Sequence, residues 1–414
     1  MSVPTLNYES LVRKNHGTAV GRDKVIKLAC ILCETEVTDP RLNRCPECKG
    51  AVDAVYDLGQ VRLDAEVTPD VLRRYFPLLP LRDKENSGWL GEGNTPCFQV
   101  PSLAEKLGIG QLWFKDESAN PTYSTKDRIA SVGLARFAEL GVRDLVLSST
   151  GNSSTAYARG VQLRPGFNLN IFVGRDFVNR LNYEDHPAIA THVVDGAFVA
   201  AGKVGMQYAK DNGYFWEGGF FNYARREGLK LAYLEAFDAM TEQPNFVFQA
   251  ISSGMGLMGA FKGAIEYREL GRMDRLPAFM AVQQESCAPM AHAFGEDVDA
   301  IAERHIIREP KGLAYAILRG DPTGTYPYIR GLCQQSGGRI LAAPETGIHE
   351  ARALLDSVGL RPCFASATSF AGAIKAAREG VLGKDSVVLV NLTGADRPAV
   401  QIPQAYSTWT ADAA

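Results

Sequence analysis

The fold class is decided by the stretch Lys115-Asp-Glu-Ser-Ala-Asn-Pro-Thr-Tyr-Ser-Thr-Lys-Asp-Arg128, in which a β-rich run turns into a helix. Asn120-Pro121 makes a turn, and Lys126 stands at the start of the helix. A lysine at such a position is partly desolvated and lies near the positive end of the helix dipole, so we expect a lowered pKa and a nucleophilic amine. Asp127 and Arg128 are expected to pair with each other or with neighbours. Taken alone, a lysine at a helix start is more often a solvated charge.

Outward from this stretch, from about residue 85, short β-rich runs alternate with amphipathic helices. The predicted strands are Leu112–Lys115, Leu145–Ser148, Asn170–Val173, Phe246–Ile251, Phe279–Gln283 and Val387–Leu392, and the predicted helices are Arg128–Leu140, Tyr157–Leu163, Glu227–Met240, Met258–Leu270, Glu350–Val358 and Ser369–Glu379. Alternation of this kind indicates an α/β fold with open, mostly parallel twisted sheets wrapped by helices on both faces. Ligands of such sheets bind at the carboxyl ends of the strands.

A second polar loop follows a predicted strand at Leu147-Ser-Ser-Thr-Gly-Asn-Ser-Ser-Thr155. Hydroxyl groups, an amide and a glycine gather there at a helix start, where free backbone N–H groups point outward. This composition suits a pocket for an anion such as a carboxylate. A helix cap with spare serines explains the same residues equally well.

A third loop lies in Phe246-Val-Phe-Gln-Ala-Ile-Ser-Ser-Gly-Met-Gly-Leu-Met-Gly259, where a β-rich run leads through glycine and serine into a helix. That geometry is typical of a phosphate cradle. Gly254-x-Gly256-x-x-Gly259 also matches the dinucleotide fingerprint, although its acidic partner would have to be Asp274, which lies in a charged loop. Finally, Thr393 ends a buried-looking strand, where its hydroxyl can face a heterocyclic nitrogen.

Bulk composition limits the possible partners. The 414 residues suffice for two or three lobes, and 46% hydrophobic with 22% charged residues is ordinary for a globular enzyme. A net charge of -3 argues against nucleic acid or an anionic membrane as main partner. Met1–Ser10 lacks a signal-peptide pattern, and the most apolar stretch, Phe246–Phe261, is interrupted by polar residues and glycines. A cytoplasmic location is the expectation.

Four of the eight cysteines form a cluster of two CxxC pairs, Cys30 with Cys33 and Cys45 with Cys48, separated by eleven residues. Four thiolates in this spacing can close a tetrahedral zinc site. A ribbon without metal and a pair of disulfides remain open as alternatives. Residues 1–50 carry eight Lys/Arg against six Asp/Glu, a balance unlike that of a nucleic-acid-binding ribbon.

Together the segments resemble threonine synthases and their fold-type-II relatives that use pyridoxal phosphate (PLP), from about Gly91 to Pro398. Further matches are Gly91-Glu-Gly-Asn-Thr-Pro96, Arg226-Glu-Gly228, Gln284-Glu-Ser-Cys-Ala-Pro289 and Ala314-Tyr-Ala-Ile-Leu-Arg-Gly-Asp-Pro322. The resemblance implies that Lys126 carries PLP as a Schiff base and is the catalytic residue. The implied cofactor-binding residues are Lys126, Asn152, Ser252, Ser253, Gly254, Met255, Gly256 and Thr393. The expected substrate-binding residues are Ser149, Thr150, Ser153, Ser154, Tyr123 and Ser124, together with Arg175 and Arg180 toward a leaving phosphate.

The resemblance also divides the chain. Residues 1–60 are expected to form a four-cysteine, ribbon-like N-terminal module with Cys30, Cys33, Cys45 and Cys48 as metal ligands. Residues 61–134 and 226–414 are assigned to a large PLP-binding domain, and 135–225 to a small mobile α/β domain. Because relatives are commonly dimers, a homodimer is expected.

Three departures from the family pattern leave the substrate open. Tyr123 and Thr125 replace a usual glycine and phenylalanine, and Cys363-Phe364 stands where relatives carry Glu-Pro. The first hypothesis is a threonine-synthase-type lyase that converts O-phosphohomoserine and water to threonine and phosphate. The second is β-replacement on an O-activated serine or threonine, as in enzymes that form cysteate or diamino acids. An NAD(P)-dependent dehydrogenase and a zinc-ribbon binding protein with an inactive enzyme core complete the alternatives.

Overall fold

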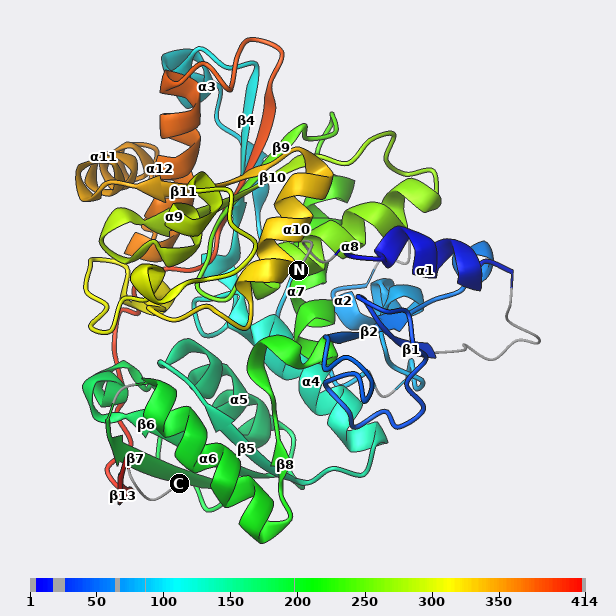
Figure 1. Cartoon of the computed structure of the whole chain (residues 1–414), viewed down its shortest axis with the longest axis vertical. Helices are drawn as coiled ribbons and strands as arrows, with labels where there is room; N and C mark the ends of the chain where they lie inside the picture. The colour runs from blue at the N-terminus through cyan, green and yellow to red at the C-terminus, as the bar shows by residue number, and fades with distance from the viewer. Residues whose placement is uncertain (1–4, 18–26, 64–67, 86, 197, 412–414) are drawn as a thin grey trace.

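The protein is described by a computed structural model that covers residues 5–17, 27–63, 68–85, 87–196 and 198–411 (Figure 1). Its strands form three sheets. Residues 1–4 of the stretch Met1–Ser10, which lacks a signal-peptide pattern, therefore lie outside the described part. Among the described helices, none is both long and apolar enough to cross a membrane.

The largest sheet has six strands in the order β11-β10-β9-β12-β4-β3, all parallel except β3, which pairs antiparallel with β4. These strands are β3 (Cys97–Gln99), β4 (Gln111–Asp116), β9 (Phe246–Ala250), β10 (Ala278–Gln284), β11 (Arg339–Ala343) and β12 (Val387–Leu392). The helices α3 (Pro101–Leu107), α11 (Glu345–Ser357) and α12 (Phe364–Arg378) cover one face, and α7 (Tyr223–Ala239), α8 (Met255–Glu269) and α10 (Tyr326–Ser336) cover the other. Alternate apolar side chains of each central strand enter the two cores, as expected for a sheet buried on both faces.

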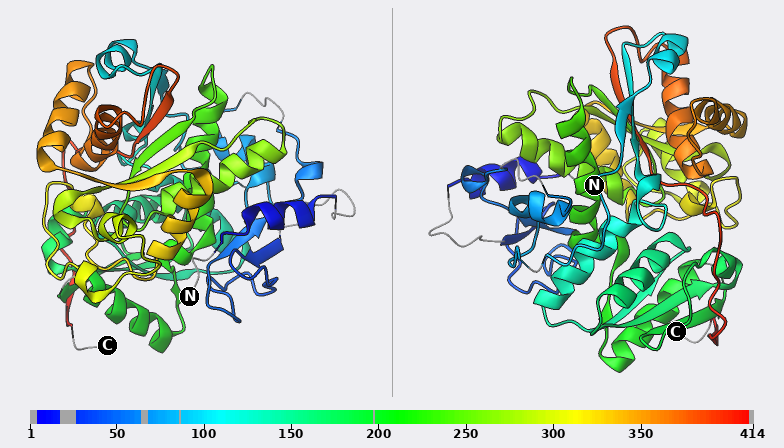
Figure 2. Two further views of the ribbon diagram at one scale, coloured as in Figure 1. Left: turned by 45° about the horizontal axis from the view of Figure 1, so that its top comes forward. Right: turned by 180° about the vertical axis from the view of Figure 1, so that it is seen from behind.

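A second, wholly parallel sheet has five strands in the order β13-β7-β6-β5-β8. They are β5 (Asp144–Ser148), β6 (Asn168–Gly174), β7 (Ile189–Asp195), β8 (Phe215–Trp216) and β13 (Ser407–Thr410). Helices α4 (Lys126–Glu139) and α5 (Asn152–Leu163) pack on one face and α6 (Phe198–Asn212) on the other. The chain after β12 runs from the six-stranded sheet to this one, as the view from behind in Figure 2 shows.

The N-terminal segment forms a small unit against α8. It contains α1 (Tyr8–Asn15) and the antiparallel pair β1 (Lys27–Cys30) and β2 (Val52–Val55), followed by the short helix α2 (Val71–Arg74). A further short helix, α9 (Pro289–Gly295), follows β10. The domain boundaries stay a prediction, and parts of each range lie outside the described residues. β13 lies in the segment assigned to the large domain yet pairs with β7 of the second sheet.

The α/β fold class with mostly parallel sheets is confirmed. Each of the six predicted strands overlaps an observed strand, and each of the six predicted helices an observed helix. The carboxyl ends of the parallel strands lie together, and this arrangement positions the site. The N–H of Thr125 donates to the carbonyl of Thr393 at 2.9 Å, which ties the start of α4 to the end of β12.

Candidate active site

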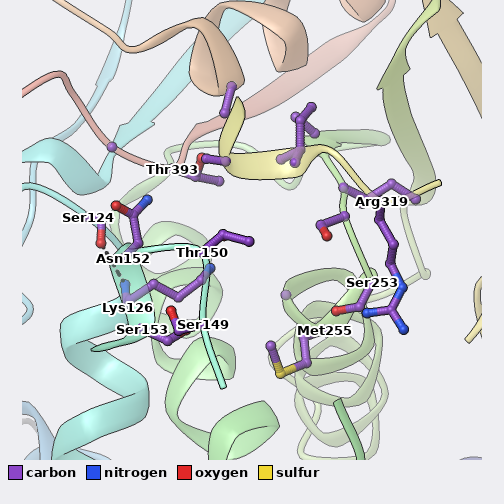
Figure 3. A pocket seen from close by; sticks show the side chains of 18 of the residues that line it. Ser124, Lys126, Ser149, Thr150, Asn152, Ser153, Ser253, Met255, Arg319 and Thr393 are labelled. Carbon is purple, nitrogen blue, oxygen red and sulfur yellow. Dashed lines mark hydrogen bonds between the residues drawn. The ribbon is translucent and has the colours of Figure 1, made fainter. Parts of the chain in front are cut away.

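One pocket lies at the carboxyl ends of the strands and gathers most of the predicted site residues. The predicted residues that line it are Ser124, Lys126, Ser149, Thr150, Asn152, Ser153, Ser252, Ser253, Gly254, Met255, Gly256 and Thr393. In Figure 3, Lys126, Asn152 and the serine loop stand on one side, and Ser253, Met255 and Arg319 on the other. Segments far apart in sequence thus converge on one cavity.

Lys126 is the first residue of α4 and is partly buried. Its backbone N–H donates to Oγ of Ser124 at 3.2 Å (Figure 3). Burial lowers the pKa of the Lys126 amine to about 8, and the guanidinium of Arg225 acts in the same direction. An amine with this pKa is still mostly protonated near physiological pH, but its neutral fraction is far larger than that of an ordinary lysine, and the neutral form can act as nucleophile or base. The lowered pKa agrees with the expectation from sequence, and Arg225 is a cause that the sequence did not reveal.

Some residues of the serine loop Ser149–Ser154 cap the start of α5, and others line the pocket. Oγ of Ser149 accepts hydrogen bonds from the N–H groups of Gly151 and Ser154, both at 3.1 Å. Ser154 is fully buried and its hydroxyl donates to the carbonyl of Gly151 at 2.8 Å, so it does not line the pocket. The start of α5 therefore presents the first-turn N–H groups of Asn152 and Ser153 and the hydroxyls of Thr150 and Ser153 to a ligand.

Asn152 has a partner that the sequence did not indicate. Nη2 of Arg397, which follows β12, donates to Oδ1 of Asn152 at 2.9 Å. With its oxygen engaged, Asn152 offers the two N–H bonds of its amide to the pocket it lines.

The glycine loop before α8 has the shape of a cradle. Gly254 adopts a left-handed φ of +84°, and a Cβ there would collide with Ile329. A Cβ on Gly256 would collide with the amide of Gln249. Packing against Ile329 and Gln249 thus requires glycine at both positions, and the backbone of this loop lines the pocket beside the first turn of α8, whose N–H groups suit a phosphate.

The donor set of the pocket matches the polar groups of PLP. The cradle suits the cofactor phosphate, and Lys126 supplies an amine with a lowered pKa. Asn152 offers N–H donors, and the Thr393 hydroxyl lines the pocket at the end of β12. The residues present fit the cofactor.

Four predicted substrate residues do not line this pocket. One is Ser154, buried under the loop. Tyr123 is 40% exposed, with a left-handed φ of +61°. Arg175 is exposed and pairs with Asp195. Arg180 is turned to the loop, where its Nε donates to the carbonyl of Thr150 at 2.9 Å.

Two cationic residues that line the pocket, Arg225 and Arg319, were not among the site residues predicted from the sequence. Arg225 is buried and binds the carboxylate of Glu217, while its Nη2 has no hydrogen-bond partner in the described part of the chain. Arg319 lines the pocket from the loop before α10, where its Nε donates to the carbonyl of Asp321 at 3.2 Å. Both lie in or beside segments that carry the family resemblance, which was the available signal. Only the fold reveals that both reach the cavity.

Neighbouring charges on α4 are paired away from the pocket. Arg128 forms ion pairs with Glu117 at 2.7 Å and Glu235 at 2.8 Å, and Glu235 also pairs with Lys115 at 2.7 Å. Asp127 accepts hydrogen bonds from the backbone and hydroxyl of Thr122. Asp127 and Arg128 thus bind neighbouring residues and not each other.

The four clustered cysteines come together in the N-terminal unit. The Sγ atoms of Cys30, Cys33, Cys45 and Cys48 all lie within 4.8 Å of one another. All eight cysteines are free, and the sulfur separations of 3.4 to 3.7 Å within the cluster exceed a disulfide bond of about 2 Å. Four convergent thiols form the donor set of a structural zinc site, so the residues fit that metal.

Comparison with known proteins identifies the class. The family model described as "Pyridoxal-phosphate dependent enzyme" matches residues 88–394. The chain therefore belongs to the family of pyridoxal-phosphate-dependent enzymes.

Within that family the chain is threonine-synthase-like. The threonine synthase of Methanocaldococcus jannaschii is 30% identical over 379 residues, which cover 88% of this chain and 91% of the relative. The cysteate synthase of Methanospirillum hungatei is 28% identical and covers 89% of each chain. Among solved structures, diaminopropionate ammonia lyase from Escherichia coli has a similar fold, with a TM-score of 0.62, 14% identity and coverage of 91% of this chain and 95% of that one.

Proposed function

We propose that this enzyme removes or replaces an O-linked leaving group of an amino acid, and that its reaction converts O-phosphohomoserine and water to threonine and phosphate. The threonine synthase relatives support this assignment. The observation that carries it is the charge of the pocket. Lys126, Arg225 and Arg319 line it, and the described lining residues include no carboxylate.

This charge balance suits several anions at once. PLP brings a phosphate, an amino acid brings a carboxylate, and an O-phosphorylated substrate brings a second phosphate. The α8 cradle is proposed for the cofactor phosphate and the start of α5 for the carboxylate. The guanidinium of Arg225, with its free Nη2 in the described structure, and that of Arg319 are then available for the leaving phosphate.

PLP, when bound, would supply an electron sink that weakens the bonds of the substrate's α-carbon. The Nζ atom of Lys126 removes the α-proton and holds it within the pocket. The backbone N–H groups of Asn152 and Ser153 would orient the carboxylate, and the neutral Thr393 hydroxyl, which lines the pocket, would be a partner for the cofactor's ring nitrogen that does not protonate it. Because the phosphate of O-phosphohomoserine is on the γ-carbon, a second proton would have to leave the β-carbon before the phosphate departs. Protons would then return to the γ- and α-carbons, and water would add its hydroxyl at the β-carbon to give threonine.

The second candidate is β-replacement on O-phosphoserine or a related O-activated serine or threonine. Its support is the cysteate synthase relative, which matches as much of this chain as the threonine synthases do. The Glu217 carboxylate bound to Arg225 also offsets part of the cationic charge of the pocket.

The dehydrogenase alternative loses its basis in the geometry. Asp274, the required acidic residue, lies in the loop before β10 and bonds to Gln243, whereas the fingerprint requires it at a strand end. The alternative of an inactive enzyme core is disfavoured by the intact set of Lys126, Asn152 and the α8 cradle.

Purified enzyme incubated with O-phosphohomoserine should release phosphate and form threonine in equal amounts, while O-phosphoserine should release little. Release from O-phosphoserine alone would reverse the order of the two candidates. An enzyme that turns over neither compound contradicts the assignment to O-phosphorylated substrates.

The proposal further includes a zinc ion on the four-cysteine cluster, a homodimer and a cytoplasmic location. Eight free cysteines are in keeping with a reducing compartment. Metal analysis of the wild type against Cys30→Ser tests the zinc ion, and light scattering of the purified protein tests the dimer.

A further inference from the structure

We propose that a metal ion on Cys30, Cys33, Cys45 and Cys48 fixes one wall of the active site, so that metal occupancy sets the affinity of the pocket for anions. This inference rests on the proposed zinc site. The wall is the segment Glu217–Tyr223, which includes part of the pocket lining. The loop Pro40–Cys45, which ends at one of the four cysteines, packs against it.

The loop packs directly on that segment. The Tyr223 hydroxyl donates to the carbonyl of Pro40 at 2.9 Å, and the Asn43 amide lies 3.5 Å from the carbonyl of Glu217. The guanidinium of Arg44, next to Cys45, lies over the ring of Phe221 at 3.4 Å from its centroid. The two chain segments approach closely, because a Cβ on Gly218 would stand 2.6 Å from Nδ2 of Asn43.

The same segment leads to the anion-binding groups. Gly219, Phe220 and Arg225 line the pocket. The Glu217 carboxylate, which binds Arg225, is held by the Tyr157 hydroxyl at 3.0 Å and by the N–H of Gly219 at 3.1 Å. A displacement of Glu217 would therefore carry the Arg225 guanidinium with it.

Regular secondary structure gives the loop little support, so the cysteines and the side-chain contacts to its neighbours hold it. It contains no helix and no strand between Pro40 and Cys45, all of which the structure describes, apart from the single bridge of Arg44 to Ala51. A tetrahedral ion would cross-link Cys45 and Cys48 to Cys30 and Cys33 and so order the loop between them.

The rest of the N-terminal unit is anchored separately. Asp53 of β2 is buried and pairs with Arg226 at 3.1 Å and with Lys262 at 3.4 Å, and the Tyr8 hydroxyl donates to it at 2.6 Å. Loss of the metal should therefore loosen the loop and its wall while β2 stays attached to α7 and α8.

Two arginines of one loop provide a matched test on the PLP-loaded full-length enzyme. Arg44 contacts the wall, whereas Arg41 donates to the carbonyl of Leu140 at 2.9 Å, at the end of α4. Arg44→Ala should retain the metal found in the wild type, exchange backbone hydrogens in peptides covering 217–223 about five-fold faster, and bind inorganic phosphate about five-fold more weakly. Arg41→Ala should match the wild type. Wild-type enzyme stripped by a chelator should reproduce the Arg44→Ala result.

Metal content, hydrogen-exchange mass spectrometry and phosphate titration are the three measurements. Equal exchange and equal phosphate affinity for Arg44→Ala and Arg41→Ala, both with metal bound, would overturn the inference. A wild-type protein without metal, or a chelated protein with an unchanged wall, would overturn it as well. Because exchange needs no substrate, lack of turnover of O-phosphohomoserine would count against the proposed reaction alone.

Discussion

Lys126 and Arg128 lie two residues apart at the start of α4, yet their charges are handled in opposite ways. Arg128 has no exposed surface and binds Glu117 and Glu235, which raise its guanidinium pKa. Lys126 faces a pocket whose described lining has no carboxylate, and burial, with the nearby Arg225, lowers the pKa of its amine to about 8. A buried charge that is paired with carboxylates has a structural role, whereas a charge without an ion-pair partner is available for chemistry.

Removal of Lys126 should have the largest effect and should spare the fold. Lys126→Ala should lower kcat by a factor of about 10³ or more and abolish the borohydride-sensitive absorbance of bound PLP. The free energy of unfolding should stay within about 0.5 kcal/mol of the wild-type value, because no partner loses an ion pair. Absorbance spectra, steady-state rates and urea unfolding measure these quantities. Lys203→Ala, an exposed lysine on α6, serves as control. A Lys126→Ala enzyme that still forms the reducible linkage would contradict this assignment.

The opposite result is expected for the compensated charge. Glu235→Gln keeps the shape of the side chain but removes the carboxylate partner of Lys115 and one of the two partners of Arg128, so the free energy of unfolding should fall by about 3–5 kcal/mol. Glu303→Gln removes the exposed partner of Arg308 and should cost about 0–1 kcal/mol. Urea unfolding of both variants makes the comparison. Equal losses would mean that the buried network contributes no more than a surface pair.

The sequence could predict the residues of the pocket better than their partners. Lys126, Asn152 and Gly254 stand in local motifs at strand-to-helix junctions, and the fold rule alone brings such junctions together. Arg397 lies in no such junction, and its contact with Asn152 spans 245 residues of sequence. Arg319 lies in a segment that carries the family resemblance, yet only the fold places it at the pocket. Arg175 follows a strand, as the prediction required, yet it pairs with the carboxylate of Asp195 and does not line the pocket.

The same limit applies to the fold. The central strands were predictable because burial on both faces gives them continuous apolar runs, as in Val387–Leu392. The edge strands β8 and β13 have two and four residues, too short for a period of two to stand out. β13 also pairs with a strand more than two hundred residues away, which no local pattern records.

The pH dependence of cofactor attachment sharpens the contrast at Lys126. Only the neutral amine attacks PLP, so the attachment rate of the apoenzyme should rise with pH through about 8 and level off above it. Arg225→Gln removes a positive charge that lowers this pKa, so the profile should move to higher pH. Arg319→Gln lines the same pocket but is not among the groups that shift the Lys126 pKa, and its profile should match the wild type. Stopped-flow absorbance measures the rates. An unmoved profile for Arg225→Gln would assign the lowered pKa to burial alone.

The smallest effect is expected at Tyr123, three residues before Lys126 on the same turn. Its φ of +61° is left-handed, a conformation that costs a residue with a Cβ about 1–2 kcal/mol and costs glycine nothing comparable. Tyr123→Gly relieves that strain, but the greater entropy of its unfolded chain lowers the free energy of unfolding by about 0.4–1 kcal/mol. The net gain in the free energy of unfolding should therefore be about 1 kcal/mol or less. Tyr123→Ala loses the same exposed ring while it keeps the Cβ, so it should show no gain. Urea unfolding separates the two variants. A Tyr123→Gly protein less stable than Tyr123→Ala would mean that the structure tolerates a Cβ in the left-handed turn without strain.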